Sequence, residues 1–217
     1  MTQADTLTAK TAATKVKQPT PEEIMKDYNY DPDGVMRISR RKVPYSLEIQ
    51  DPDPNWPIQF ESLKADIEAA LGPKAICISH VGSTSVPGLP AKNIIDIDLT
   101  VADTANQDDY IPALESAGFQ WTLYEPGWHN HHFLVRYEPM TNLHVFSEGC
   151  PELVRHQMFR NHILNNKEDR ELYIKAKRDA ASVTTQNGEQ GMDYNLRKEK
   201  VIREILQRIW KEAGFIE

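Results

Sequence analysis

The chain has 217 residues, of which 40% are hydrophobic and 26% charged, and its formal net charge is -7. This balance is typical of a globular protein with enough apolar material for a core that needs no disulfide or metal. The negative charge argues against broad, sequence-independent nucleic-acid binding, because neutralising phosphates takes clustered Lys and Arg. The two cysteines, Cys77 and Cys150, form no CxxC pair, so the sequence carries no thiolate zinc motif.

No stretch reaches the roughly 18 apolar residues of a membrane span, and the N-terminus lacks the apolar region of a secretory signal. We therefore expect a cytoplasmic protein without membrane contact. Residues 1–20 are rich in Thr, Ala and Lys, with almost no large apolar side chains, which predicts disorder. Together with the turn-rich, basic stretch that follows, they are interpreted as a flexible or loosely packed extension over residues 1–44. The folded domain is expected over residues 45–217.

Hydrophobic periodicity predicts a domain in which strands and helices are mixed. Strands are expected at 45–49, 75–81, 94–101, 119–124, 132–137 and 143–146, the last two forming a hairpin. Helices are expected at 107–118, 151–164, 167–181, 194–213 and, ended by Gly72-Pro73, at 56–71. The buried stripe of the last helix is expected to contain Leu196, Val201, Ile205, Leu206 and Ile209. The pattern predicts an α/β (α+β mixed) fold, a mixed sheet flanked by helices with a C-terminal helical segment.

A loop of small residues follows the strand expected at 75–81. Gly82 removes side-chain bulk, so that a phosphate can approach the backbone. The amides and hydroxyls of Ser83, Thr84 and Ser85 can then donate to the phosphate oxygens. Lys92, at the far end of the loop, can offer its charge to a polyphosphate or a carboxylate. The sequence therefore predicts a phosphate-binding loop.

Two carboxylates lie on the next expected strand. Asp96 and Asp98 are two residues apart, so they share one face of the strand, separated by two rises of about 3.3 Å. Acidic groups this close repel each other unless a cation lies between them. Mg²⁺ suits this place, because it takes oxygen ligands and commonly binds one or two carboxylates plus substrate phosphates. Asp96 and Asp98 are therefore predicted as metal ligands and catalytic residues.

The order of these motifs resembles that of known proteins. A Gly-Ser pair followed by Asp-x-Asp, with twelve residues between Ser83 and Asp96, resembles the signature of the nucleotidyltransferase superfamily. The longer run His-Val-Gly-Ser-Thr-Ser-Val-Pro-Gly-Leu from residue 80, followed by Ala-Lys and Ile-Asp-Ile-Asp, resembles the GrpB-like family. The similarity runs from about residue 45 to 210 and includes Trp56 with Phe60, Leu143-His144-Val145, Phe159-Arg160 and Tyr194-x-x-x-Lys198. It implies a nucleotidyltransferase-like fold, whereas the activity of the family is poorly defined.

The chain departs from the family pattern at several positions. Ser79 stands where the family often has Glu, and Asn93 and Asn161 stand where it has Pro and Asp. Active nucleotidyltransferases usually place a third carboxylate on a neighbouring strand, and the resemblance puts His144 at the corresponding place of this chain. A histidine is a better ligand for Zn²⁺ or Mn²⁺ than for Mg²⁺. His144 could alternatively act as a base, or simply fill the gap.

Four of the seven histidines fall between residues 129 and 144. His132 and His144 are the stronger candidates, because hairpin partners could bring both beside Asp96 and Asp98. His132 is expected to share a strand face with Leu134 and Arg136, and a metal site at His129 and His131 is the weaker alternative. His80 either orients the loop or belongs to the site. The candidate phosphate or carboxylate clamps are Arg136 and Arg160, to which the family match adds Lys198.

These residues favour a nucleotide-dependent transferase that uses Mg²⁺, with Mn²⁺ or Zn²⁺ as alternatives, and ATP or another NTP. Lys92 and Arg160 would stabilise developing negative charge. The acceptor would be a hydroxyl, amine or carboxylate of a small molecule or protein, and a carboxylate would make the reaction that of a ligase, through an acyl-adenylate. A non-catalytic nucleotide or metabolite sensor remains an alternative, as does a hydrolase with a transition metal. The oligomeric state stays open.

Overall fold

The computed structural model describes residues 17–28, 31–189 and 191–217. Most of the segment predicted to be disordered lies outside these residues. Within them, the strands form one six-stranded sheet in the order β1-β4-β5-β6-β3-β2. Its strands are β1 (Met36–Arg37), β2 (Cys77–Val81), β3 (Ile95–Val101), β4 (Gln120–Glu125), β5 (His131–Tyr137) and β6 (Met140–Ser147). β3 and β6 are parallel and the other neighbours are antiparallel, which confirms the predicted mixed sheet.

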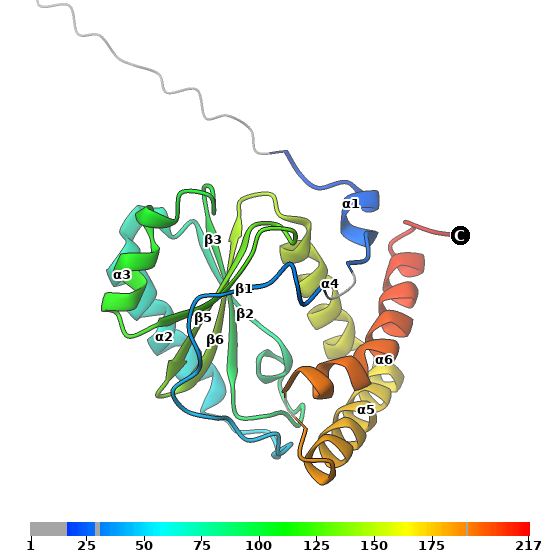
Figure 1. The fold of residues 1–217 in the computed structure, drawn as a ribbon. Coiled ribbons are helices and arrows are strands. Elements are labelled where there is room, and N and C mark those ends of the chain that lie inside the picture. Colours follow the sequence, from blue (N-terminus) through cyan, green and yellow to red (C-terminus); the bar gives the residue numbers. More distant parts are fainter. Residues whose placement is uncertain (1–16, 29–30, 190) are drawn as a thin grey trace, which may run out of the picture.

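Helices cover both faces of this sheet (Figure 1). On one side lie α2 (Trp56–Leu71) and α3 (Ile111–Ser116), and on the other lie α4 (Pro151–Asn165), α5 (Lys167–Gln186) and α6 (Gly191–Glu212). Helix α1 (Pro21–Met25) lies against α4, and the short 3-10 turns are η1 (Gly72–Lys74), η2 (Ser83–Ser85) and η3 (Gln107–Asp109). The predicted helices at 56–71, 151–164, 167–181 and 194–213 are confirmed. The helix expected at 107–118 is instead split into η3 and α3, with Pro112 in the first turn of α3.

Two apolar clusters hold the layers together. On the α2 side, Phe60, Leu63 and Ile67 recur at helical spacing and pack against Ile97 and Leu99 of β3. On the other side, a second cluster joins the loop after η2 to α4, α5 and α6, and its buried members are Val86, Leu89, Ile163, Tyr173, Ile205, Leu206, Ile209 and Trp210. The expected stripe of α6 is therefore right at residues 205, 206 and 209. It is wrong at Leu196, which is 47% exposed.

The segment over residues 31–50, here called the N-terminal strap, lies along the sheet and reaches α6. β1 pairs with β4 and so forms one edge of the sheet, and Arg41 donates a hydrogen bond of 2.6 Å to Oδ1 of Asn142 on β6. Gln50 bridges Ala91, but residues 45–49 form no strand, so the strand predicted there is wrong. Before the strap, Ile24 of α1 is buried. The part of the predicted loose extension that the structure describes thus makes defined contacts with the domain.

Candidate functional site

The two predicted carboxylates lie on the same face of β3, as their spacing indicates. Ile95, Ile97 and Leu99 point to the other side and are fully buried. In the parallel pairing of β3 with β6, Asp96 is opposite Asn142 and Asp98 is opposite His144. His144 therefore lies beside Asp98 on the side of the sheet that α4, α5 and α6 cover.

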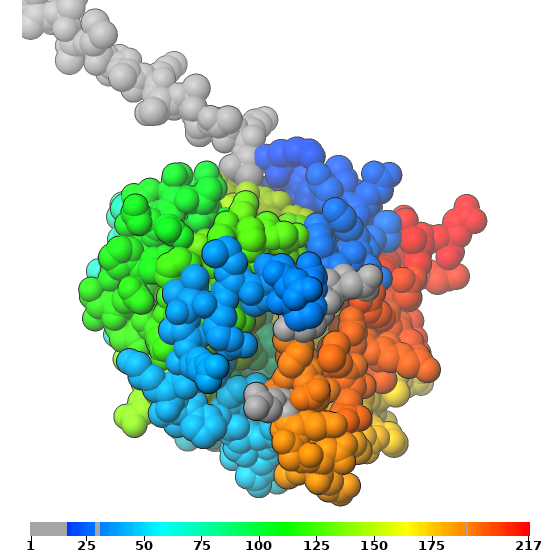
Figure 2. Space-filling view, viewed as in Figure 1, coloured from blue at the N-terminus to red at the C-terminus, as the bar shows by residue number. Residues whose placement is uncertain are grey.

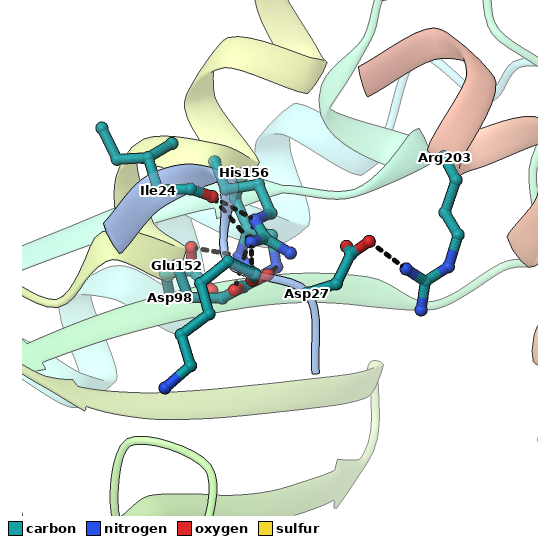
Figure 3. Close-up of polar contacts among 8 residues, drawn as sticks. Ile24, Asp27, Asp98, Glu152, His156 and Arg203 are labelled. Atoms are coloured by element: carbon teal, nitrogen blue, oxygen red, sulfur yellow. Dashed lines mark hydrogen bonds and ion pairs between the residues drawn. The ribbon is translucent and has the colours of Figure 1, made fainter. Parts of the chain in front are cut away.

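Asp98 forms an ion pair with a histidine of α4. The carboxylate is 1% exposed, and its Oδ2 lies 2.8 Å from Nδ1 of His156, whose Nε2 is 3.5 Å from Glu152 (Figure 3). Burial alone would lower the pKa of His156, but Asp98, with Glu152 and Asp96, raises it to about 9. The other oxygen, Oδ1 of Asp98, is buried and has no hydrogen-bond partner among the described residues.

Asp96 is held between Asn142 and the glycine of the loop. Nδ2 of Asn142 donates to Oδ1 of Asp96 at 2.7 Å, so Asn142 links Asp96 to Arg41 of the strap. Burial raises the pKa of Asp96, while the Asn142 hydrogen bond and the charges of nearby lysines oppose the rise. Gly82 has φ 68° and ψ -168°, a conformation restricted essentially to glycine, and its backbone lies directly against the Asp96 side chain.

The predicted phosphate loop forms the 3-10 turn η2, and its side chains are largely engaged in fixing it. Ser85 Oγ donates to the Gly82 carbonyl at 2.7 Å, and Arg160 donates to Ser85 Oγ at 3.2 Å and to its carbonyl at 3.1 Å. His80 stacks on Phe60, and its Nε2 is hydrogen-bonded to Thr84 Oγ1 at 3.0 Å. His80, Thr84, Ser85 and Arg160 thus position the loop.

Ser83 is more open than its neighbours in the loop. It is half-buried, and its hydroxyl lies 3.4 Å from the hydroxyl of Tyr173 on α5. Thr84 and Ser85, by contrast, are buried, and the Thr84 hydroxyl donates to the Ile94 carbonyl. Of the three loop hydroxyls, that of Ser83 is therefore the best placed to meet a ligand.

Three lysines, here called the lysine cluster (Lys92, Lys177 and Lys198), converge on the region of Asp96. Burial, followed by mutual repulsion for Lys92 and Lys177, lowers the pKa of Lys92 and Lys198 to about 8 and of Lys177 to about 7, while Asp96 opposes each shift. No described carboxylate forms an ion pair with any of them. Lys177 is 1% exposed.

Aromatic rings complete the wall around the lysine cluster. Lys92 Nζ lies 4.9 Å from the ring centroid of Tyr45 and 4.3 Å from that of Tyr194, and Lys198 Nζ lies 4.7 Å from Tyr194. Such ring faces favour a cation without neutralising it. On the face shown in Figure 2, the surface is hollowed between the blue strap and the orange start of α6. The strap and α6 thus border the region in which the cations gather.

Two predicted site residues lie on the opposite face of the sheet. His132, Leu134 and Arg136 do share one face, but it is the face covered by α2 and α3. His132 stacks on Tyr124 with the centroids 4.5 Å apart, and Arg136 forms an ion pair with Asp66 at 2.5 Å. The expectation that His132 lies beside Asp96 and Asp98 is therefore wrong, and Arg136, predicted as a phosphate or carboxylate clamp, contacts a carboxylate of α2 on that opposite face. Because helices cover both faces of the sheet, the alternation of side chains does not show which face carries the site.

His131 takes the place expected for His132. Its Nε2 lies 3.0 Å from Nδ1 of His144, and its Nδ1 lies 2.8 Å from Oε2 of Glu125 on β4. Burial, with repulsion from neighbouring histidines, holds the pKa of His131 well below its usual range and lowers that of His144 to about 3. No pattern in the sequence indicated Glu125 as the hydrogen-bond partner of a site histidine. The pairing of Phe133 with His144 across the hairpin could have indicated His131, since residues 131 and 133 share a face.

The donor set fits a divalent cation only in part. The described residues contain no group of three His, Cys, Asp or Glu side chains placed to hold a metal ion. Ser79 is the β2 neighbour of Asp98, so no carboxylate stands at that position. The oxygens of Asp96 and Asp98, including the unpartnered Oδ1, suit a Mg²⁺ ion whose other ligands come from substrate phosphates. The residues therefore fit a cation that binds together with a polyphosphate.

The mixed sheet with helices on both faces, and the loop and Asp-x-Asp pair at β2 and β3, are consistent with the nucleotidyltransferase-like superfamily. The family model described as GrpB protein matches residues 46–208, and the chain belongs to this family. It is 39% identical over 163 residues to a UPF0157 protein of Halalkalibacterium halodurans, covering 75% of this chain and 82% of that protein. It is 36% identical over 168 residues to a UPF0157 protein of Streptomyces coelicolor, covering 76% and 86%.

Two further similarities concern a solved structure and a named enzyme. The crystal structure of conserved protein GrpB from Enterococcus faecalis has a TM-score of 0.65 and 24% identity, covers 77% of this chain and 99% of that one, and shares the fold. A dephospho-CoA kinase of Mycolicibacterium paratuberculosis is 28% identical over 194 residues, which cover 77% of this chain but 47% of the kinase. In the described part of this chain, no helix is long and apolar enough to cross a membrane.

Proposed function

We propose that the chain binds a nucleoside triphosphate with Mg²⁺ and transfers its nucleotidyl group to an acceptor. The observation that carries this proposal is the contact of the Gly82 backbone with Asp96, beside a lysine cluster that forms no ion pair with a carboxylate of the described residues. Buried cations without counter-ions are costly, and a polyanion would supply the missing negative charge. A polyphosphate fits both the loop and the cluster.

Each group has a distinct role in this proposal. Asp96 and Asp98 would hold the Mg²⁺, which when bound neutralises phosphate charge. Ser83 would donate to a phosphate oxygen, while Lys92 and Lys198 would hold the polyphosphate chain from the other side. Arg160 would act by fixing the loop, because its hydrogen bonds go to Ser85 and Asn161.

A second candidate is a protein that binds the nucleotide without turning it over. Two observations favour it: Ser79 leaves Asp98 without an acidic neighbour on β2, and His156 already occupies one oxygen of Asp98. The name of the dephospho-CoA kinase from Mycolicibacterium paratuberculosis does not support kinase activity here. This chain spans about half of that protein, and the sequence of this chain contains no GxxxxGK[ST] phosphate-binding motif.

Calorimetry with ATP, in the presence and absence of Mg²⁺, tests the binding site. We expect metal-dependent binding by the wild type and its loss in an Asp96→Asn/Asp98→Asn double variant that stays folded. Asp108→Asn, an exposed substitution elsewhere on the chain, is the matched control. If neither ATP nor the other three NTPs bind with any divalent metal, the proposal is wrong. Metal-dependent release of pyrophosphate then separates a transferase from a binding protein.

A further inference from the structure

Three hydrogen-bonded side chains cross one face of the sheet and end at His144, the β6 neighbour of Asp98. Glu125 of β4 contacts Nδ1 of His131 at 2.8 Å, and Nε2 of His131 contacts Nδ1 of His144 at 3.0 Å. The His131 side chain is 2% exposed, and the three residues lie on adjacent strands of one sheet face. We call them the Glu125–His131–His144 chain.

The order of contacts defines which ring nitrogen of His144 carries a proton. A carboxylate of Glu125 accepts from Nδ1–H of His131, so a neutral His131 has a bare Nε2. That bare nitrogen accepts from Nδ1–H of His144, and a neutral His144 therefore has a bare Nε2 in turn. Among the described residues, this last nitrogen makes no hydrogen bond. The chain thus ends in an unused acceptor.

His144 lies close to the two predicted metal ligands. It is the β6 neighbour of Asp98, and its ring centroid lies 6.2 Å from that of His156. The loop glycine lies against Asp96, two residues earlier on the same strand. His144 and the loop therefore lie beside successive carboxylates of β3.

We propose that Nε2 of His144 is the general base that removes a proton from the acceptor, with His131 and Glu125 as positioning residues. The inference rests on the proposed function and specifies its acceptor as a hydroxyl or an amine. A carboxylate acceptor is ionised at neutral pH and has no proton to give up. The Glu125–His131–His144 chain therefore favours nucleotidyl transfer to a hydroxyl or an amine over transfer to a carboxylate, which would form an acyl-adenylate.

In the proposed step, the acceptor replaces pyrophosphate on the α-phosphorus. The acceptor oxygen or nitrogen forms a bond to the α-phosphorus of the nucleoside triphosphate, and the bond from that phosphorus to the bridging oxygen breaks. Pyrophosphate leaves with the electron pair of the broken bond. The acceptor proton moves to Nε2 of His144, and the carboxylate of Glu125 stabilises the resulting positive charge through His131. Solvent then takes the proton from His144, which restores the base.

Nitrogen NMR of the full chain labelled in histidine tests the arrangement without any substrate. The signals of His144 are assigned by their loss in His144→Gln. We expect a protonated Nδ1 and a bare Nε2 in the wild type, and a shift towards the other tautomer in Glu125→Met, which removes the acceptor. His129→Asn, a neighbour outside the chain whose φ of 57° asparagine tolerates, should leave the His144 signals unchanged. A protonated Nε2 on wild-type His144 would overturn the inference.

Pyrophosphate release with ATP, Mg²⁺ and separate panels of alcohols, amines and carboxylic acids tests the chemistry. We expect release with alcohols or amines, a fall of about 100-fold or more in His144→Gln, and a fall of at least about tenfold in Glu125→Met. Calorimetric ATP affinity should stay the same in both variants. Release with carboxylic acids alone, or unchanged turnover in His144→Gln, contradicts the inference while the nucleotide site stands. If the wild type does not bind ATP, the proposed function is wrong, and the proposed acceptor step is wrong with it.

Discussion

The backbone of Gly82 lies so close to Asp96 that a Cβ at position 82 would be 2.9 Å from the Asp96 Cβ and 3.0 Å from its Cγ. The loop that would meet a phosphate and the carboxylate that would hold a metal are therefore packed as one unit. A shift of the loop would therefore also displace the Asp96 carboxylate. Such a coupling would hold the phosphate and the metal in a fixed geometry relative to each other.

The first prediction concerns this contact. Gly82→Ala should cost about 1–3 kcal/mol of stability through backbone strain and should abolish Mg²⁺–ATP binding, because the new methyl group displaces Asp96. Gly88→Ala is the matched control. Gly88 has a similar φ of 71°, but the added Cβ would meet only the flexible side chain of Arg170. Thermal unfolding and calorimetry should show lower stability in both variants and loss of binding in Gly82→Ala alone.

A second prediction uses the β2 neighbour of Asp98. Ser79→Glu places a carboxylate opposite Asp98 on the neighbouring strand. We expect this variant to bind Mn²⁺ or Mg²⁺ at least about tenfold more tightly in the presence of ATP, since each added carboxylate ligand strengthens binding of a hard cation. Ser79→Gln has nearly the same size without the charge. Equal affinities of the Glu and Gln variants in calorimetry would show that the carboxylate does not reach the ion.

The third prediction concerns pH. The pKa of buried Lys177 is lowered from 10.5 to about 7 by burial and by Lys198, Lys92 and Arg178, with Asp96 opposing them. Between these two values the unfolded chain binds a proton that the folded chain does not, so this lysine makes the free energy of unfolding rise with pH. Relative to Lys177→Met, the wild type should therefore gain stability from pH 7 to about 10.

Denaturant titrations at several pH values measure this difference. Other groups titrate in the same range, so the comparison between wild type and variant is the informative quantity. Lys175→Met, an exposed substitution on the same helix, should run parallel to the wild type. A constant difference between wild type and Lys177→Met over this range would mean that Lys177 keeps its proton in the folded protein.

A fourth prediction concerns α1. Arg155 donates to the Ile24 carbonyl at 3.0 and 2.6 Å and also to the carbonyl of Lys26. Figure 3 shows these contacts beside the ion pair of Asp27 with Arg203. Arg155→Met should speed hydrogen exchange in residues 20–27 by roughly ten- to a hundredfold, because charged hydrogen bonds are worth about 1.5–3 kcal/mol. Unchanged exchange would show that burial of Ile24 alone holds α1, and Arg178→Met is the exposed control.

Much of the fold could be predicted from local patterns. The helix at 56–71 shows regular apolar spacing and a Gly-Pro end, and Asp96 and Asp98 share a face because a strand has a period of two. The strand expected at 45–49 failed, because alternation over five residues does not provide a partner for pairing. Leu196 is exposed because, at about 3.6 residues per turn, it lies on the opposite side of α6 from Tyr194 and Ile205, which are both buried.

The candidate site could be predicted only where its residues are close together in the sequence, as the loop residues and the carboxylates of β3 are. The other site residues come from distant segments and include Arg41, Glu125, His131, His156 and Lys177. The sequence does not distinguish His131 from His132 as a site residue, because this sheet is covered by helices on both faces and alternation alone does not show which face carries the site. The ion pair of His156 with Asp98 joins residues 58 positions apart, which only the tertiary fold brings together.

The strap also bears on how the protein can be altered. Arg41, which donates to Asn142, and Tyr45, whose ring faces Lys92, precede residue 46, where the match to the GrpB family begins. Both side chains therefore border the region of Asp96 and Lys92 from outside the matched residues 46–208. This border can be re-engineered in a short upstream segment without changing any residue of the matched domain.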